Sequence, residues 1–422
     1  ARNFGEVSKA LHDLVQWKIL IERRHLGAYG VFAGSDFDIE GAISQARGEI
    51  GGPSLEHVTA LSDLQPVLAK RFYAETGTMH WFTRRIVRIA ELSHTLENFK
   101  QDKGSAGSFF LCLPDGDTSE RSAERHVRTA SYEHQTVPAL LGTPTNASRI
   151  SELALELAAA ERVMKTRPEL EGDAVARREL AGRLAAVRGA LEDELADAFV
   201  LSKWFWKGER IGADKHSSLS SIASGVAKTL YHRAPTVFSE LLNREDPSSN
   251  SNKARKDLMY QMIRSSAREN LGYTGYPADA GLYYTILQAT GLHRRDEKRG
   301  WGFFEPYATN PRLEGMWHMW SATRERVARP GHETTAADLY AFWAEPPYGV
   351  RAGIMPVLAL AFYLANRSEL AMYVDGLFTP DLSEAVVDDW LQDPQRIRFQ
   401  YVAASKDQES LVKAIAASVS EQ

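Results

Sequence analysis

The chain has 422 residues, of which 44% are hydrophobic and 25% charged, as in an ordinary globular protein of roughly two to four domains. Its formal net charge of −5 argues against nucleic-acid binding through bulk charge, so any such binding would depend on local basic clusters. The single cysteine, Cys112, excludes an internal disulfide and indicates a reducing compartment. No signal peptide is visible, and the longest apolar run, residues 353–365, is too short to span a bilayer. We therefore expect a cytoplasmic protein without a membrane partner.

The first predicted elements are a helix and a β-hairpin. Apolar residues share one face of residues 4–20, and two short extended runs surround the glycine-containing turn 26–30. A helix followed directly by a hairpin is typical of the end of a winged-helix unit, which we assign to residues 1–50. Because the chain enters this helix almost at its first residue, we expect it to be a piece of a longer protein. The basic residues that would reach DNA phosphates here are Lys18, Arg23, Arg24 and His25. Packing of this hairpin on a neighbouring domain is the alternative.

The stretch Ser35-Asp36-Phe37-Asp38 has two interpretations. Asp-x-Asp places two carboxylates on one face of a strand, which suits divalent metals and phosphoryl transfer. In that case Asp36 and Asp38 would serve a metal-dependent phosphoryl-transfer enzyme. Alternatively, Ser35 caps a helix and Asp38 is the third helical residue, as in a capping box. We favour the cap, because it accounts for every residue of the stretch, and we predict no metal ligand and no catalytic residue in this chain.

Residues 51–145 are predicted to form a small mixed α/β domain. Apolar runs at 109–113 and 136–141 flank a helix over 119–132, and strand, helix and strand at this spacing predict a parallel βαβ unit. The run 78–89 also looks extended and carries a basic cluster. Its candidate DNA contacts are Arg84, Arg85 and Arg88.

Residues 146–200 are predicted to form a long antiparallel helical hairpin. Apolar residues recur at spacings of three and four on both sides of a short loop, and each series includes a leucine that should lie in the seam, Leu157 and Leu184. Pro168 should end the first helix, since proline disfavours helical geometry in the residue before it. Asp173 should cap the second helix.

The remainder is predicted to contain two further winged-helix-like units, in residues 201–335 and 336–422. In the first, helices precede a charged loop over 293–299 and a short strand over 301–304. In the second, Asp375-Gly376 predicts a type I′ hairpin turn. The candidate DNA contacts in this half are Lys253, Arg255, Lys256, Arg294 and Arg295. The predicted fold class is therefore α+β, predominantly helical and multidomain.

Several short stretches together resemble one protein family. They are LGAYG (26–30), GSDFD (34–38), ELLNR (240–244), PSS (247–249), LGYTGYP (271–277), TGLHR (290–294), PPYG (346–349) and YVDGLF (373–378). These stretches resemble the region downstream of the ATPase module in large bacterial P-loop ATPases of phage defence, the BREX and Pgl phage-exclusion ATPases. The resemblance implies a cytoplasmic bacterial defence protein whose ATP and Mg²⁺ would bind an upstream module. The chain lacks the Walker motifs of that family, so the resemblance carries ATP hydrolysis to no residue here.

These observations predict a non-catalytic region that binds double-stranded DNA or docks onto other defence-system subunits. No cofactor is expected in this chain itself, and a homo-oligomer or hetero-oligomer is expected. A purely structural oligomerisation module is a further alternative.

Overall fold

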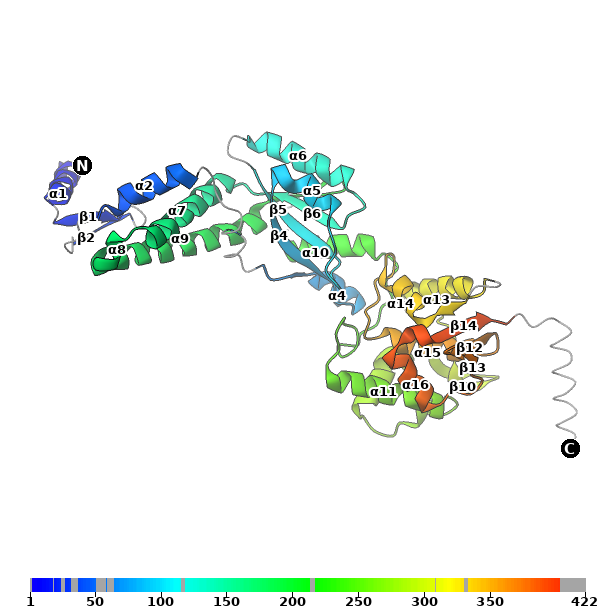
Figure 1. Cartoon of the computed structure of the whole chain (residues 1–422). Helices are drawn as coiled ribbons and strands as arrows, with labels where there is room; N and C mark the ends of the chain where they lie inside the picture. The colour runs from blue at the N-terminus through cyan, green and yellow to red at the C-terminus, as the bar shows by residue number, and fades with distance from the viewer. Residues whose placement is uncertain are drawn as a thin grey trace, which may run out of the picture. The chain divides into compact units, whose positions relative to one another are not determined.

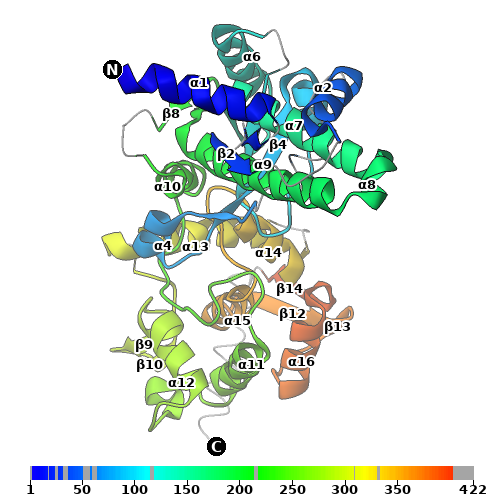
Figure 2. The ribbon, with the colours of Figure 1, turned by 90° about the vertical axis from the view of Figure 1, so that its left-hand side faces the viewer.

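The chain forms two compact units (Figures 1 and 2). Unit 1 comprises Ala1–Val67 and Phe82–Leu219, and unit 2 comprises Leu68–Trp81 and Ser220–Gln422. The computed structural model describes residues 2–17, 19–23, 27–31, 37–50, 58, 64–114, 118–212, 217–307, 309–329 and 333–402. Both units mix helices with strands, which confirms the α+β fold class. The division into five domains and the assignment of winged-helix units stay predictions.

A six-stranded mixed sheet is the centre of unit 1. Its strands, in spatial order, are β3 (Val67–Leu68), β4 (Trp81–Arg88), β5 (Gly107–Leu113), β6 (Ala139–Thr143), β7 (Lys203–Trp206) and β8 (Glu209–Ile211). Strands β4, β5 and β6 are parallel, whereas β6, β7 and β8 pair antiparallel. Every residue of β5 and β6 is buried, as expected for central parallel strands. The predicted parallel βαβ unit is thereby confirmed.

Helices cover one face of this sheet. A short 3₁₀ turn, η2 (Ile89–Glu91), and helix α5 (Leu92–Glu97) follow β4, and α6 (Glu120–Glu133) follows β5. Apolar side chains of these helices form one cluster with residues that point from β4, β5 and β6. Cys112 belongs to this cluster and is fully buried, and burial raises the pKa of its thiol to about 12. Such a thiol is not a nucleophile at neutral pH.

Two long helices are inserted between β6 and β7. Helix α7 (Ala147–Thr166) and helix α9 (Ala174–Leu201) pack along each other, joined by the short α8 (Glu169–Gly172), and α2 (Ile39–Ile50) packs on α7 (Figure 1). Asn146 at the start of α7 donates a hydrogen bond to Glu194 near the end of α9, so the two helices are antiparallel. The Asp173 carboxylate accepts from two backbone N–H groups at the start of α9, as a cap should.

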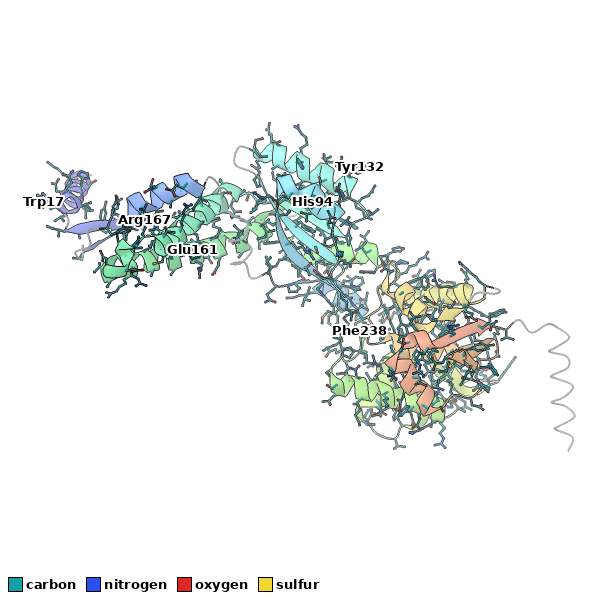
Figure 3. All side chains as sticks on the ribbon, in the orientation of Figure 1. Trp17, His94, Tyr132, Glu161, Arg167 and Phe238 are labelled. Atoms are coloured by element: carbon teal, nitrogen blue, oxygen red, sulfur yellow. The ribbon has the colours of Figure 1, made fainter. Side chains whose placement is uncertain are left out.

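The N-terminal elements expose much of their apolar surface. Helix α1 (Arg2–Gln16) precedes β1 (Leu20–Arg23) and β2 (Ala28–Val31), which pair antiparallel as a two-stranded sheet. Val31 is 77% exposed, and Trp17, labelled in Figure 3, is 69% exposed. Little of this apolar surface is therefore covered by the residues that the structure describes.

Unit 2 is built around a helix that is buried on all sides. This helix, α15 (Met355–Ala365), matches the predicted buried helix within 353–365. The other helical elements here are α4 (Lys70–Thr76), α10 (Leu219–Leu230), α11 (Ser249–Arg264), η3 (Glu269–Gly272), α12 (Ala278–Leu282), η4 (Tyr283–Gln288), η5 (Pro311–Leu313), α13 (Glu314–Val327), α14 (Ala336–Ala344), α16 (Glu384–Gln392) and η6 (Pro394–Arg396). Side chains from most of them enter one continuous core.

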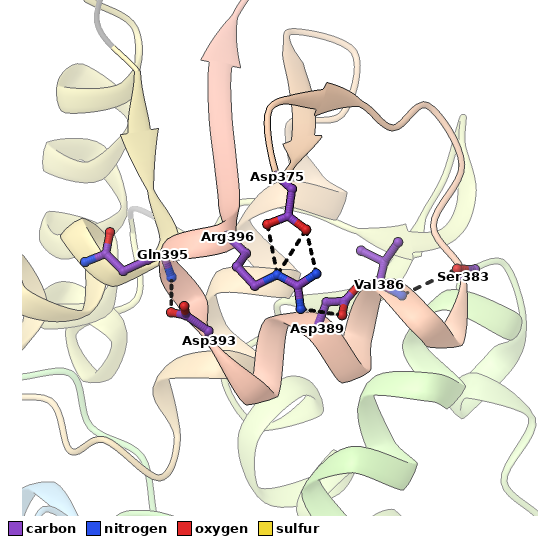
Figure 4. Close-up of polar contacts among 7 residues, drawn as sticks. All are labelled: Asp375, Ser383, Val386, Asp389, Asp393, Gln395 and Arg396. Carbon is purple, nitrogen blue, oxygen red and sulfur yellow. Dashed lines mark hydrogen bonds and ion pairs between the residues drawn. The ribbon is translucent and has the colours of Figure 1, made fainter.

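A four-stranded sheet and a separate β-hairpin complete unit 2. The sheet has the order β11 (Thr334–Thr335), β14 (Ile397–Tyr401), β12 (Leu370–Val374) and β13 (Leu377–Phe378), and the separate hairpin is β9 (His293–Asp296) with β10 (Gly300–Phe303). The predicted turn between β12 and β13 is confirmed, because Asp375 and Gly376 both have positive φ, 50° and 81°. Arg396 donates to Asp375 from Nε over 2.9 Å and to Asp389 from Nη1 over 2.7 Å (Figure 4). Its guanidinium holds the pKa of Asp375 below the ordinary value.

Candidate nucleic-acid interface

The predicted DNA contacts of the N-terminal hairpin cannot be placed. Lys18, Arg24 and His25 lie outside the described residues, and Arg23 lies in β1 but its side chain is likewise outside them. Their proposed role as phosphate contacts stays a prediction.

The three arginines of β4 all have partners within the fold. Arg84 donates from Nε to the carbonyl of Gln65 over 2.7 Å, and its guanidinium lies 5.1 Å from the ring centroid of Phe199. Arg85 pairs with Asp102 at 2.9 Å. Arg88 pairs with Glu91. Each guanidinium would therefore exchange an existing contact for a phosphate, which lowers the net gain on binding DNA.

The cations near the start of α11 also have partners. Lys253 lies 3.4 Å from Asp257, and Lys256 lies 2.7 Å from Asp388. Arg255 is half-buried and donates to the carbonyl of Gly353 over 3.1 Å, and burial lowers its pKa. Arg255 and Lys256 link α11 to neighbouring segments, whereas Lys253 pairs within α11 itself and remains well exposed.

Arg294 and Arg295 lie in a β-hairpin rather than in the predicted charged loop. Strand β9 pairs antiparallel with β10, and only Glu297 to Arg299 form the connection. The Asp296 carboxylate accepts from the backbone N–H groups of Lys298 and Arg299, each over 3.0 Å. These two hydrogen bonds lower the pKa of Asp296 and fix the turn.

The hairpin presents two exposed cations that are not among the predicted DNA contacts. Lys298 and Arg299 are exposed at its turn, beside the exposed Arg295 of β9. None of the three forms an ion pair with another residue in the parts of the chain that the structure describes. In the sequence, this turn is indicated by Asp296 and by Gly300 four residues later, which has a φ of 73°.

A buried histidine ties the hairpin to the neighbouring helices. His293 Nε2 donates to the carbonyl of Ser266 at 2.9 Å, and its Nδ1 forms a hydrogen bond with the Tyr283 hydroxyl at 3.1 Å, in which Nδ1 is the acceptor when the ring is neutral. Its ring stacks on Trp301, with 5.5 Å between the ring centroids. Burial lowers the pKa of His293, which favours the neutral ring. The hairpin is thus held to η4 and to the segment after α11.

The helix beside the hairpin has an irregular backbone. Helix α12 continues directly into the π-helix η4, and this pair contacts α11 and β9 (Figure 2). Asn270 and Leu271 of η3, the element before α12, have positive φ angles of 48° and 53°. Asn270 Oδ1 accepts from Gln288 Nε2 at 3.1 Å, which links this unusual turn to the end of η4. π-helices and non-glycine residues of positive φ both concentrate at functional sites.

The exposed side of this helix is small and polar. Its one acidic residue, Asp279, accepts a hydrogen bond from the Tyr273 hydroxyl at 2.7 Å and is half-buried. The exposed positions are Ala278, Gly281, Thr285, Gln288 and Ala289. Because none of these exposed positions carries a carboxylate, this side of the helix does not itself repel a polyanion.

Asp38 caps α2 and is not its third residue. Helix α2 begins at Ile39, and Asp38 Oδ1 accepts from the backbone N–H of Gly41 at 2.9 Å. The structure therefore corrects the assignment of the cap to Ser35, because a cap must lie directly before the first helical residue. Ser35 and Asp36 fall outside the described residues. Among the residues that are described, no group of three or more His, Cys, Asp or Glu could hold a metal ion.

Comparisons with known proteins give no relative. No protein family matches the chain, and neither a curated protein nor a solved structure matches it. No helix within the described ranges is long and apolar enough to cross a membrane.

Proposed function

We propose that this chain is a non-catalytic region that binds double-stranded DNA through the β9–β10 hairpin and the α12–η4 helix of unit 2. The observation that carries the proposal is the set of exposed cations at the hairpin, Arg295, Lys298 and Arg299, which form no ion pair among the described residues. The other predicted basic residues with described side chains all have partners within the fold. A free cation can neutralise a phosphate without first breaking an internal contact.

In this proposal the helix and the hairpin act together as a winged-helix-like unit. The exposed side of α12–η4 would enter the major groove, and the hairpin would contact the adjacent backbone. Thr285 and Gln288 are the exposed polar side chains of that helix, and their hydroxyl and amide oxygens can accept hydrogen bonds from base edges while Thr285 Oγ1 and Gln288 Nε2 donate to Gly281 and Asn270. His293 keeps the two elements in a fixed relation through Tyr283, as a two-part contact surface needs.

The charge of the hairpin supports phosphate contacts in an otherwise acidic chain. Residues 293–303 hold four basic and two acidic side chains, a net charge of +2 if His293 is neutral, whereas the whole chain carries −5. Binding would therefore depend on this cluster and would weaken steeply with salt.

The wider role that we propose follows from the family resemblance. The chain would serve a cytoplasmic phage-defence ATPase of the BREX or Pgl type, whose ATP and Mg²⁺ bind another module, and it would act beside other defence-system subunits. Docking onto such a subunit, rather than onto DNA, is the second candidate function, and the exposed Val7, Trp17 and Val31 favour it.

A salt titration of duplex binding tests the DNA proposal. Changing Arg295 and Lys298 to Ala should flatten the slope of log K against log salt by about two units, since each phosphate contact contributes roughly −0.9. The loss should be similar for unrelated DNA sequences, because phosphates carry no sequence information. The measurement is fluorescence anisotropy of labelled duplexes at several salt concentrations.

A charge-matched variant is the control. Lys228 and Arg398 are cations of unit 2 that pair with Glu75 and Glu333, and changing both to Ala should leave the salt slope as in the wild type. Equal slopes for the wild type and the hairpin variant would remove the hairpin from any DNA interface. Absence of duplex binding by the wild type would reject the DNA proposal and leave subunit docking or a purely structural role.

A further inference from the structure

We propose that the outer face of the hairpin stacks on an unpaired base, so that the chain prefers duplex DNA interrupted by unpaired nucleotides over an intact duplex. This inference deepens the proposed function and rests on it. It is drawn from four neighbouring side chains, which we call the arginine–aromatic ladder. They are Tyr307, Arg294, Phe304 and Arg299.

Arg294 is the fixed centre of the ladder. Its guanidinium lies 4.2 Å from the ring centroid of Tyr307 and 4.8 Å from that of Phe304. Its Nη1 also donates to the carbonyl of Glu305 at 2.8 Å. Gly302 is paired with Arg294 across the hairpin. Because Gly302 has no side chain, the Phe304 ring lies close to its backbone, only 3.6 Å from where a Cβ would be. Arg294 is thus committed to stacking within the fold rather than to a phosphate.

Arg299 is the exposed end of the ladder. Its guanidinium lies 5.1 Å from the Phe304 ring centroid, and its backbone N–H is held by Asp296. The residue is exposed, so its guanidinium has surface open to solvent beside the Phe304 ring. A flat, weakly hydrated cation in this position can stack on a nucleobase while it remains charged.

Tyr307 is the other exposed end. Its ring lies against Gly291, where an added Cβ would be 3.3 Å from the ring, and the residue is still 49% exposed. Nucleobases stack on aromatic rings and on guanidinium groups with little dependence on sequence. The faces of paired bases are covered by their neighbours in a duplex. Only an unpaired base can extend the ladder, which is why we infer a preference for interrupted duplexes.

The test compares two DNAs and two conservative variants. The DNAs are a short duplex and the same duplex with a bulge of unpaired thymines, and the readout is anisotropy at fixed salt. We expect the wild type to bind the bulged DNA about tenfold more tightly, the scale of one base–aromatic stack. Arg299→Lys keeps the charge but removes the flat group, so it should lose the preference and keep its affinity for the intact duplex.

The matched control is Arg295→Lys. Arg295 is also an exposed arginine of the hairpin, but it has no ring contact with a described residue, so this variant should retain the preference for the bulge. Tyr307→Leu should weaken the preference from the other end of the ladder. Equal binding of both DNAs by the wild type, or a preference unchanged in Arg299→Lys, would overturn the inference while the proposed duplex binding stands. No binding to either DNA would overturn both.

Discussion

The two units differ in the ionisable groups that they bury. In unit 1, the buried Arg183 of α9 pairs with Glu156 of α7 at 2.7 Å and also with Glu40 of α2, so opposite charges neutralise one another. In unit 2, His80 and His293 are almost completely buried, and burial lowers the pKa of both. Unit 1 therefore neutralises its buried guanidinium with two close carboxylates, whereas unit 2 buries neutral imidazoles beside a guanidinium, Arg351, that lies 3.9 Å from the carboxylate of Glu245.

The contacts of His80 show what keeps a buried imidazole of unit 2 neutral. Its Nδ1 lies 2.7 Å from Arg351 Nη2, and its ring stacks on Tyr231 with 4.1 Å between the centroids. Because arginine keeps its proton, His80 Nδ1 must be the acceptor. Arg351 also donates from Nε to the carbonyl of Met79 at 2.7 Å, which fixes the segment between β3 and β4 within unit 2. A proton on Nδ1 would place two cations in contact.

The largest expected effect on stability comes from removing the Arg351 side chain. Arg351→Met should lower the free energy of unfolding of unit 2 by about 4 kcal/mol, since it leaves the largely buried carboxylate of Glu245 without its cation and the buried polar groups of Met79 and His80 without a donor. Hydrogen exchange of the α15 amides under mild urea reports unit 2, and exchange of the α9 amides reports unit 1. Only the α15 amides should lose protection. The control is Arg398→Ala, which removes an exposed pair and should cost at most about 1 kcal/mol.

An intermediate effect is expected in the helical hairpin of unit 1. Leu157 is fully buried and Leu184 is half-buried, so Leu157→Ala should cost about 3 kcal/mol and Leu184→Ala about 1 kcal/mol. Both losses should be independent of pH between about 5 and 7, because the described residues of α7 and α9 include no histidine. Urea unfolding followed by exchange of the α7 amides measures them. Equal costs at the two positions would show that the seam is wrongly placed.

The smallest expected effect is acid destabilisation confined to unit 2. The folded pKa of His80 and His293 lies below the ordinary 6.5, so their contribution to stability is complete above pH 6.5 and is lost as the pH falls toward the folded values. Exchange of the α15 amides should therefore accelerate as the pH falls below 6.5, after correction for the intrinsic rate. The histidines of unit 1 with described side chains, His12, His94, His126 and His134, are exposed or half-buried. Acceleration of the α9 amides to the same extent would remove the contrast between the units.

Local signals in the sequence predicted the local structure of both units well. Asp173 caps α9, Asp375-Gly376 forms the tight turn, and the apolar runs around α6 form parallel strands. Each depends on residues close together in the chain: a side chain that reaches its own helix start, a backbone angle, or a repeating apolar position. In the second helical seam, Leu184 is half-buried and packs on the apolar cluster that α2, α7 and α9 share, while its neighbour Arg183, which the apolar pattern could not indicate, is buried.

The functional surface could not be predicted in the same way, because a lone cation and a paired cation look alike in a sequence. Lys256 is paired with Asp388, and Arg351 with His80, across more than a hundred intervening residues. Only the fold brings such partners within hydrogen-bond distance, and among the residues that the structure describes Arg299 has a ring contact but no ion pair. The sequence by itself determined the cap of α9, the tight turn at Asp375-Gly376 and the apolar strands around α6, since those preferences act over a few residues. The tertiary structure decided which charges are neutralised, because Coulomb attraction and burial depend on distance in space and not along the chain.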